Sequence, residues 1–223
     1  MKLPEIIYTE DGSSSLFSVE LNEAYHSKYG AINESRHVFI DAGFNSLTIK
    51  SSINILEIGF GTALNAWLTL LECTEKRSHI YYHALEPFPL SSSIYSQLNY
   101  AEIITDQQPK NLFLSLHETA WNSNIKLNEF FNLKKQNQKL EETTLHNDFY
   151  DLVYYDAFSP AVQPELWIAA IFEKINKAMR INGIFVTYSA KGSVRRNLKE
   201  AGFEVERLPG PRGKREMIRA VKQ

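Results

Sequence analysis

The chain has 223 residues, of which 43% are hydrophobic, and a formal net charge of −2. These values suit one α/β domain with a modest extension and an ordinary core. The lone cysteine, Cys73, excludes a disulfide framework and a cysteine-rich metal site, and the 6 histidines lack metal-binding spacing, so we expect no metal. Neither a leader-like segment nor a membrane-spanning apolar run stands out, so we expect a cytoplasmic protein with no membrane partner.

Charge is divided unevenly along the chain. Residues 1–173 carry 11 Lys and Arg against 22 Asp and Glu, whereas residues 174–223 carry 13 against 4, which gives formal charges of −11 and +9. A basic face on an acidic body is typical of an enzyme that grips nucleic-acid phosphates with one surface. A solvated helix face with ordinary strand-edge lysines is the alternative.

Residues 1–50 are predicted to form an N-terminal extension that caps a domain made by residues 51–223. Glu34, Arg36 and His37 are expected on a helix of this extension, either at the surface or in the wall of a substrate site. Strand-like apolar runs then alternate with helix-like segments, which indicates an α/β fold with a doubly wound, mostly parallel sheet of seven strands. The runs cover residues 53–58, 80–85, 130–133, 152–155, 184–188, 203–208 and 216–221.

The connecting segments carry helix and turn signals. A helix is predicted from Pro164 to about Met179, ended by Asn182 and Gly183, and another over 195–201. Cys73 is expected to be buried in a helix, and the polar segment 136–147 is predicted to be a surface helix. The last two strands, joined by the Pro- and Gly-rich turn 209–213, are predicted to form a C-terminal antiparallel hairpin.

A glycine loop follows the first central strand. Gly59 and Gly61 provide a tight turn that lets a ligand approach the backbone, but Leu64 breaks the dinucleotide fingerprint and no phosphate-loop lysine follows. The pattern from Glu57 to Ala63 resembles the first motif of class I, Rossmann-like S-adenosylmethionine-dependent methyltransferases, although a turn after any buried strand is the alternative. The candidate cofactor-binding residues of the loop are Glu57, Gly59, Phe60, Gly61 and Asn65.

Two further acids end predicted strands. Glu86 lies where an acid accepts hydrogen bonds from ribose hydroxyls in nucleotide-binding folds, unless it is a surface residue restrained by Pro87. Asp156 leaves a central apolar strand and enters the crevice where open sheets bind ligands. Because a carboxylate can orient an amine and take up its proton, Asp156 is our catalytic candidate, and it also borders the cofactor site. A plain turn-forming role before Ser159 and Pro160 is the alternative.

A basic group is expected near the same edge of the sheet. Phe158 and Tyr188 are candidates to stack on an unpaired base, with core packing as the alternative. The candidate phosphate ligands, whose alternative role is solubility, are Lys191, Arg195, Arg196, Arg207, Arg212, Lys214 and Arg215.

Several strings together resemble one family, the tRNA 5-aminomethyl-2-thiouridine methyltransferases, which comprises the MnmC-type methyltransferase domain and stand-alone MnmD-like relatives. The resemblance spans most of the chain and implies that the glycine loop holds S-adenosylmethionine, Glu86 its ribose, and Asp156 the acceptor amine. Ala63 departs from the third glycine of many relatives. The matching strings include residues 25–27, 34–40, 56–62, 156–160, 164–167, 193–196 and 213–217.

The resemblance implies methylation of the primary amine of 5-aminomethyl-(2-thio)uridine at the tRNA wobble position, giving 5-methylaminomethyl-(2-thio)uridine. Two-domain relatives add a flavin-dependent oxidoreductase for which this chain has no room, so another enzyme is expected to supply the amine. One alternative is a small-molecule amine methyltransferase or aminopropyltransferase of the same fold. Another is an RNA-binding adaptor that has lost its activity.

Overall fold

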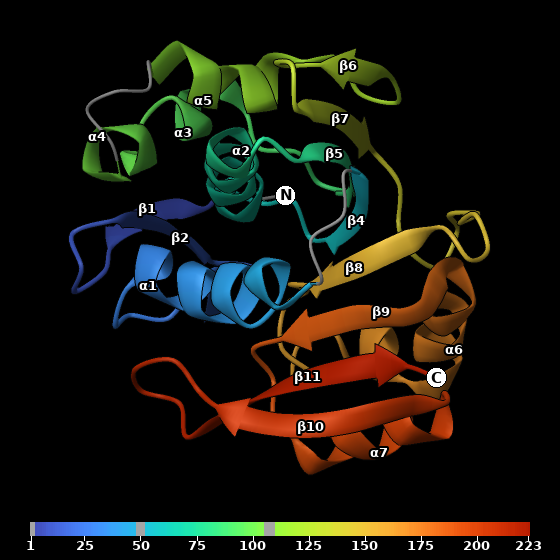
Figure 1. Cartoon of the computed structure of the whole chain (residues 1–223). Coiled ribbons are helices and arrows are strands. Elements are labelled where there is room, and N and C mark those ends of the chain that lie inside the picture. Colours follow the sequence, from blue (N-terminus) through green and yellow to red (C-terminus); the bar gives the residue numbers. More distant parts are fainter. Residues whose placement is uncertain (1–2, 48–51, 105–109) are drawn as a thin grey trace.

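An eight-stranded sheet runs through the centre of the molecule, with helices on both faces (Figure 1). The computed structural model describes residues 3–47, 52–104 and 110–223. In their order across the sheet, the strands are β10 (Phe203–Pro209), β11 (Glu216–Lys222), β9 (Met179–Thr187), β8 (Tyr150–Tyr155), β4 (Ser52–Ile58), β5 (His79–Leu85), β7 (Phe131–Gln136) and β6 (Asn124–Lys126).

The centre of this sheet is parallel, as predicted. Strand β4 pairs in parallel with β5 on one side and β8 on the other, and β8 pairs in parallel with β9. The C-terminal strands β10 and β11 form the predicted antiparallel hairpin, which joins the sheet through β9. All seven predicted strands are present. The eighth, β6, is a short antiparallel addition beyond β7 that we did not predict.

Helical segments connect the strands and cover both faces of the sheet. Cys73 is buried in α2, as expected. The helical segments are α1 (Ala31–Ser35), the π-helical η1 (Arg36–Asp41), η2 (Phe44–Ser46), α2 (Leu64–Lys76), α3 (Ser92–Tyr95), α4 (Tyr100–Ile104), α5 (Lys110–Glu118), η3 (Pro164–Trp167), α6 (Ala169–Ala178) and α7 (Gly192–Glu200).

Alternation along β4 divides its side chains between two cores. Ile53 and Ile55 belong to the core that includes buried residues of α2 and α5. Leu56 and Ile58 belong to the other core, with buried residues of α6 and α7. Because successive side chains of a strand point to opposite faces, Glu57 points to the face that α2 covers. Each fully buried aliphatic side chain contributes about 1.5–3 kcal/mol.

The N-terminal segment builds a small antiparallel sheet of its own, made of β1 (Glu5–Tyr8), β2 (Ser14–Ser18) and β3 (Glu23–Ala24). Leu16 of β2, and Val38 and Phe39 of η1, are buried in the core that α2 shares. This segment is therefore packed onto the larger sheet. Residues 1–2 and 48–50 of the predicted extension lie outside the described residues, and the division at residue 50 remains a prediction.

Three local predictions were wrong. The polar segment 136–147 is not a helix: Gln136 ends β7, and the residues after it form turns. The helix predicted from Pro164 is two segments, because Ile168 adopts an extended backbone (φ −87°, ψ 157°) between η3 and α6. Asn182 and Gly183 lie within β9, near a register irregularity against β8, and do not precede the strand.

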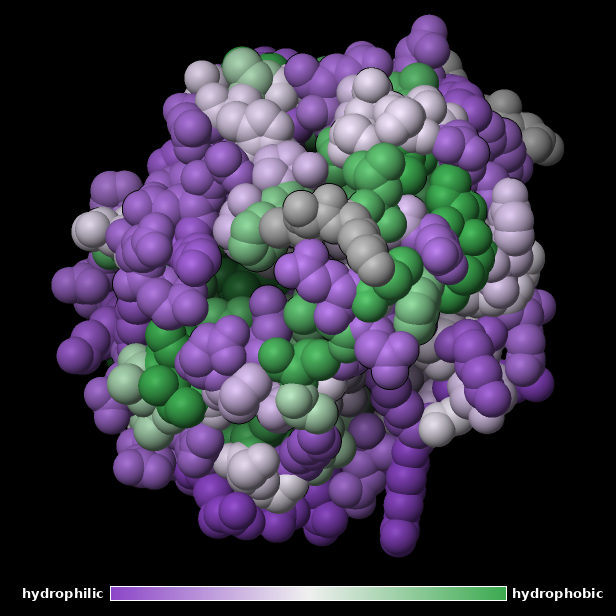
Figure 2. Space-filling view, turned by 180° about the vertical axis from the view of Figure 1, so that it is seen from behind, coloured by the Kyte–Doolittle hydropathy of each residue, from purple (hydrophilic) through white to green (hydrophobic). Residues whose placement is uncertain are grey.

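The surface is mostly hydrophilic when the molecule is seen from behind, and apolar residues gather around a hollow near the middle of that face (Figure 2). No helix among the described residues is both long and apolar enough to cross a membrane.

Candidate active site

The ends of β4, β5 and β8 are joined by backbone hydrogen bonds. The Gly59 N–H donates to the Leu85 carbonyl (3.0 Å), and the Asp156 N–H donates to the Ile58 carbonyl (2.9 Å). Strand order reverses between β4 and β8, which is where open α/β sheets bind ligands. A cavity of about 500 Å³ opens here. Its lining includes the glycine loop, Glu86, Asp156, residues 23–27, Glu34, residues 138–141 and Lys214.

Gly59 allows the loops after β4 and β8 to touch. Its backbone has a φ of +91°, and a Cβ atom at this position would lie 2.5 Å from the Asp156 carbonyl oxygen. Both the backbone conformation and the space therefore require glycine. Phe60 turns inward, is 3% exposed, and packs edge-on against the rings of His117 and Trp121. The loop thus offers its backbone to the cavity while the Phe60 ring anchors it.

Glu86 folds back onto the glycine loop. Its carboxylate oxygens accept hydrogen bonds from the N–H groups of Gly61 (2.9 Å) and Phe88 (2.8 Å). Burial raises the pKa of Glu86, and both backbone hydrogen bonds oppose that rise because they favour the charged form. Glu86 therefore lines the cavity beside the loop, as the ribose prediction requires.

The side-chain amide of Asn65, in the first turn of α2, connects two acids. Its Nδ2 donates to Glu57 Oε1 at 3.1 Å and to Asp156 Oδ2 at 2.8 Å. Glu57 is fully buried, and neither its Oε2 nor Asn65 Oδ1 has a hydrogen-bond partner among the described residues. Buried polar atoms without partners are uncommon in folded proteins, and Asn65 lines the cavity, so its Oδ1 is available to a ligand that donates a hydrogen bond.

Burial changes the charge of both acids. It raises the pKa of Asp156 to about 7, while the Asn65 hydrogen bond acts against the rise and the negative charge of Glu34 adds to it. Burial, followed by the charge of Asp156, raises the pKa of Glu57 well above its ordinary value. Near neutral pH, Asp156 is therefore close to its midpoint.

The loop from Asp156 to Pro160 is held by side chains from distant segments. The Tyr188 hydroxyl donates to the Ala157 carbonyl at 2.9 Å, and the indole N–H of Trp167 donates to the Phe158 carbonyl at 2.8 Å. These bonds fix the backbone directly after Asp156. Asp156 is thus held in place both by the central strand β8, which it follows, and by the hydrogen-bonded loop that it begins.

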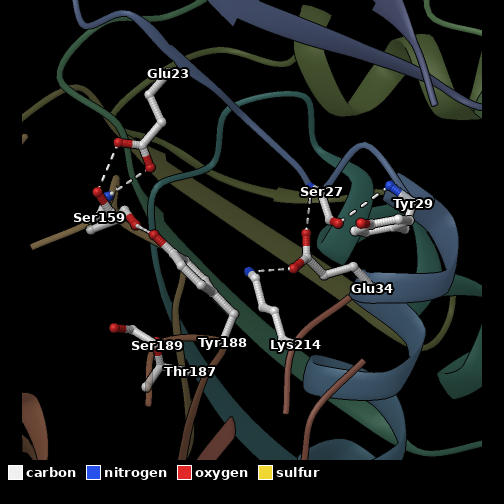
Figure 3. A network of polar contacts seen from close by, with 10 residues as sticks. Glu23, Ser27, Tyr29, Glu34, Ser159, Thr187, Tyr188, Ser189 and Lys214 are labelled. Atoms are coloured by element: carbon white, nitrogen blue, oxygen red, sulfur yellow. Dashed lines mark hydrogen bonds and ion pairs between the residues drawn. The ribbon is translucent and has the colours of Figure 1, made fainter. Parts of the chain in front are cut away.

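The N-terminal segment braces the same loop from the other side. The Ser159 hydroxyl and N–H both donate to the Glu23 carboxylate, at 2.8 and 3.2 Å (Figure 3). The ring of Tyr25 meets Phe158 edge to face, with centroids 5.0 Å apart. Glu23, Tyr25 and Phe158 all line the cavity. This side of the cavity is therefore built jointly by residues 23–25 and the loop after β8.

Lys214 lies in the cavity wall, although we predicted it as a phosphate ligand. Its ammonium contacts Glu34 Oε1 at 2.6 Å and lies 4.0 Å from the centroid of the Tyr188 ring. Glu34 also accepts a hydrogen bond from the Ser27 N–H at 2.7 Å. Glu34 thus belongs to the wall of the site, whereas Arg36 is exposed and His37 bonds the Pro209 carbonyl.

The other predicted phosphate ligands lie at the surface. The Arg212 side chain is 71% exposed and pairs with Glu10 at 3.1 Å, and Arg207 pairs with Glu216 at 3.1 Å. The remaining four make no ion pair with any other residue that the structure describes, and their charges are open to a partner. They are Lys191, Arg195 and Arg196 at the start of α7, and Arg215 before β11.

Sequence reasoning missed several lining residues. Glu23 was placed only in a general N-terminal cap, and Tyr25 and His26 only in a string shared with the family that the chain resembles. Composition could have pointed to Tyr25 and His26. They are polar and aromatic residues, as binding sites often contain, in a segment without a strong helix or strand pattern. Residues 138–141 escaped because their polarity was taken as helix surface.

The cavity fits S-adenosylmethionine, which the glycine-loop spacing predicted. The cofactor has an ammonium group, and Asn65, which lines the cavity, has a buried Oδ1 acceptor without a partner among the described residues. It also has ribose hydroxyls, and the Glu86 carboxylate lies beside the glycine loop. Among the described residues, no group of three or more His, Cys, Asp or Glu side chains is arranged to hold a metal ion.

Comparison with known proteins agrees with this fit. A family model described as S-adenosyl-L-methionine-dependent methyltransferase matches residues 99–223. The chain is similar to the tRNA 5-methylaminomethyl-2-thiouridine biosynthesis bifunctional protein MnmC of Nitrosospira multiformis, with 27% identity over 92% of this chain and 35% of that protein. The MnmC protein of Hydrogenovibrio crunogenus is 29% identical over 96% of this chain and 33% of its own length. The chain therefore spans about a third of these relatives.

Solved structures give the same picture. The crystal structure of MNMC2 from Aquifex aeolicus superposes with a TM-score of 0.81 at 28% identity, covering 100% of this chain and 71% of that one. A spermidine synthase in complex with the transition state analogue AdoDATO superposes with a TM-score of 0.58 at 11% identity, covering 98% of this chain and 74% of the other. The second similarity shows the fold alone.

Proposed function

The chain belongs to a family of S-adenosyl-L-methionine-dependent methyltransferases, and we propose that it methylates the primary amine of 5-aminomethyl-(2-thio)uridine at the tRNA wobble position. The product is 5-methylaminomethyl-(2-thio)uridine. One observation carries the proposal: Asp156, with a pKa raised to about 7, lies in the same cavity as the glycine loop and an aromatic acceptor wall. The names of the MnmC relatives support the choice of acceptor.

The cofactor half of the site is proposed to be the glycine loop with its neighbouring acids. Glu86 accepts hydrogen bonds from the ribose hydroxyls, and the backbone of Gly59, Phe60 and Gly61 lies against the cofactor. Asn65 offers its free Oδ1 to the ammonium, and Glu57 orients the Asn65 amide from behind. When bound, S-adenosylmethionine supplies a methyl group on a positively charged sulfur, which keeps the electron pair of the broken carbon–sulfur bond.

Asp156 is proposed to act on the acceptor amine. A primary amine is mostly protonated near neutral pH and has no free lone pair in that form. Ionised Asp156 accepts a hydrogen bond from the amine nitrogen, orients its lone pair and takes up the proton that must leave. A pKa near 7 suits this role, because the carboxylate is available and still basic enough to accept a proton.

The acceptor is proposed to reach this cavity from an anticodon loop. A wobble base is already unpaired, so little energy is needed to extract it. Phe158 provides an aromatic surface in the cavity, while the Tyr188 ring is partly covered by the Lys214 ammonium. Lys191, Arg195, Arg196 and Arg215 are proposed to contact phosphates. Because tRNA is a cytoplasmic substrate, the same proposal implies a cytoplasmic enzyme.

The test is transfer of a radiolabelled methyl group from S-adenosylmethionine to tRNA with and without 5-aminomethyl wobble uridine. We expect incorporation only into the aminomethyl tRNA, with the label in 5-methylaminomethyl-(2-thio)uridine after digestion. Incorporation only into small amines would contradict the proposal and favour the small-molecule alternative. Cofactor binding without any transfer would favour an adaptor.

A further inference from the structure

The ion pair between Glu34 and Lys214 lies in the part of the cavity wall where the acceptor is proposed to bind. Glu34 comes from α1, and Lys214 comes from the turn between β10 and β11 (Figure 3). Their side chains are 8% and 33% exposed, so the carboxylate is almost buried while the ammonium is partly open. Ser27 and Tyr188 hold the two partners from either side. The pair is thus fixed in position before any acceptor binds.

Stability alone does not explain such a pair. A buried ion pair gains little over well-packed apolar side chains, because removing both charges from water costs about as much as their attraction returns. Glu34 and Lys214 also line the cavity that holds Asp156, and both of their charges influence Asp156. The two charges therefore face the site at which the acceptor is proposed to bind.

Each partner has unused hydrogen-bonding capacity. An ammonium has three N–H donors, and Glu34 accepts one of them. A carboxylate offers about four acceptor positions, of which Lys214 and the Ser27 N–H use two. The pair therefore presents donors next to acceptors in one wall of the cavity.

This arrangement of donors and acceptors is complementary to the edge of uracil but not to that of cytosine. The edge of uracil carries the N3–H donor next to the O4 acceptor, whereas cytosine carries an N3 acceptor next to an amino donor. The C5 substituent is adjacent to C4, so an aminomethyl group lies on the O4 side of the ring. We propose that Lys214 donates to O4 and Glu34 accepts from N3–H, so that the pair selects uridine over cytidine; this rests on the proposed function.

The experiment compares two anticodon stem–loop RNAs that carry 5-aminomethyluridine or 5-aminomethylcytidine at the wobble position. The readout is the ratio of their kcat/KM values for methyl transfer, which does not depend on how much of a variant is folded. For one or two charge-assisted hydrogen bonds, the wild-type protein should favour the uridine RNA by about 10- to 100-fold. Glu34→Gln and Lys214→Met should each lower this ratio by about tenfold.

A third RNA isolates the contact of Glu34. Methylation at N3 of the 5-aminomethyluridine removes the donor, so Glu34→Gln should cause almost no further loss on this RNA. The matched control is the surface pair of Glu102 and Lys110, which are 2.7 Å apart and 47% and 44% exposed. Glu102→Gln and Lys110→Met should leave the ratio at the wild-type value.

The outcomes separate the inference from the proposed function. If the uridine RNA is methylated but neither Glu34→Gln nor Lys214→Met changes the ratio, the recognition role is wrong and the proposed function stands. If the wild-type protein methylates both RNAs equally, the recognition role is also wrong. If neither RNA accepts a methyl group, the proposed function fails and this inference fails with it.

Discussion

At the scale of single residues, the protonation state of Asp156 decides what the cavity can do. Burial raises its pKa to about 7, and the proposed base is active only when ionised. We therefore predict that kcat/KM rises with pH up to an inflection near pH 7. Asp156→Asn should lose about 10²- to 10⁴-fold in kcat while still binding S-adenosylmethionine.

The check is a pH–rate profile of both proteins together with cofactor affinity by calorimetry. The amine titrates well above pH 7 and contributes a second rise that both proteins share. An inflection near pH 7 that persists in Asp156→Asn would contradict the assignment.

The same carboxyl links folding stability to pH. Its pKa of about 7 in the folded protein lies above its ordinary value of 3.8, so its stabilising contribution is present below about pH 4 and is lost as pH rises through 7. Asp156→Asn does not titrate. We predict that it is more stable than wild type by about 1–3 kcal/mol near pH 8 and similar near pH 4, less than the full shift implies because the side chain is partly exposed.

Urea unfolding at both pH values measures this difference. Asp41→Asn is the control, because Asp41 is exposed and lies outside the cavity lining. The prediction fails if the stability difference between Asp156→Asn and wild type is the same at both pH values.

Asn65 acts through Asp156. Its amide donates to the ionised carboxylate at 2.8 Å and favours the charged form. Asn65→Ala removes that donor, so the pKa of Asp156 should rise and the inflection of the pH–rate profile should move to higher pH. Asn128→Ala, which removes a bond to Thr74 away from the cavity, should leave the inflection in place. A lower kcat with an unmoved inflection would indicate only a structural role.

At the scale of elements, the turn between β10 and β11 positions Lys214. Gly213 has a φ of +87°, and a Cβ atom there would lie 2.1 Å from the Tyr29 ring. Gly213→Ala should therefore destabilise the protein by about 1–2 kcal/mol from its backbone alone, with a further loss from the clash. Its uridine-over-cytidine ratio should fall as well, because Lys214 is displaced.

Gly202 provides a matched control for this substitution. It has almost the same φ, +88°, but its nearest neighbour would be 3.8 Å from an added Cβ. Gly202→Ala should lose only the stability that comes from the backbone conformation and should keep the wild-type uridine-over-cytidine ratio. Tyr29→Ala in the Gly213→Ala background should recover part of the stability, measured by urea unfolding. Equal losses for the two glycine variants would show that the Tyr29 contact does not matter.

The strength of the hydrophobic pattern in each segment explains which strands and helices could be predicted. Strands β4 and β8 are mostly apolar because both of their faces are covered, and the prediction placed them correctly. Strand β6 has only three residues, Asn124–Lys126, two of them polar and exposed, so nothing in its composition marks a strand. The polar composition of segment 136–147 fits a surface helix and a turn equally well. The cavity that some of its residues line forms only when distant parts of the chain come together, so local sequence does not reveal it.

At the scale of the whole molecule, separation along the chain limits what a sequence can show. Gly59, Glu86 and Asp156 could be predicted to lie close together because each directly follows a strand, and the ends of parallel strands meet at one edge. Glu34 and Lys214 lie 180 positions apart and carry no shared pattern. Composition showed that the C-terminal part is basic, but only the fold separates Lys214 in the cavity from the arginines at the surface.

That separation predicts how RNA binding depends on salt. The four surface residues without ion pairs should release counterions when they contact phosphates, and each phosphate contact contributes about 0.7–0.9 to the slope of log K against log salt. Arg195→Ala with Arg196→Ala should therefore reduce the slope by about 1.5 and weaken binding to all tRNAs alike. Arg207 and Arg219 are equally basic, but they already pair with Glu216 and Glu206 across the hairpin, at 3.1 and 2.8 Å.

Substitution of Arg207 and Arg219 by alanine should accordingly leave the slope almost unchanged, although the formal charge falls by the same amount in both double variants. The measurement is a filter-binding titration of unmodified tRNA at several salt concentrations, which does not require methyl transfer. If net charge alone determined the salt dependence, the slope would fall equally in the two double variants. A selective loss in the Arg195 and Arg196 variant would instead locate the RNA backbone at the start of α7, beside the carboxyl edge of the sheet at which the cavity opens.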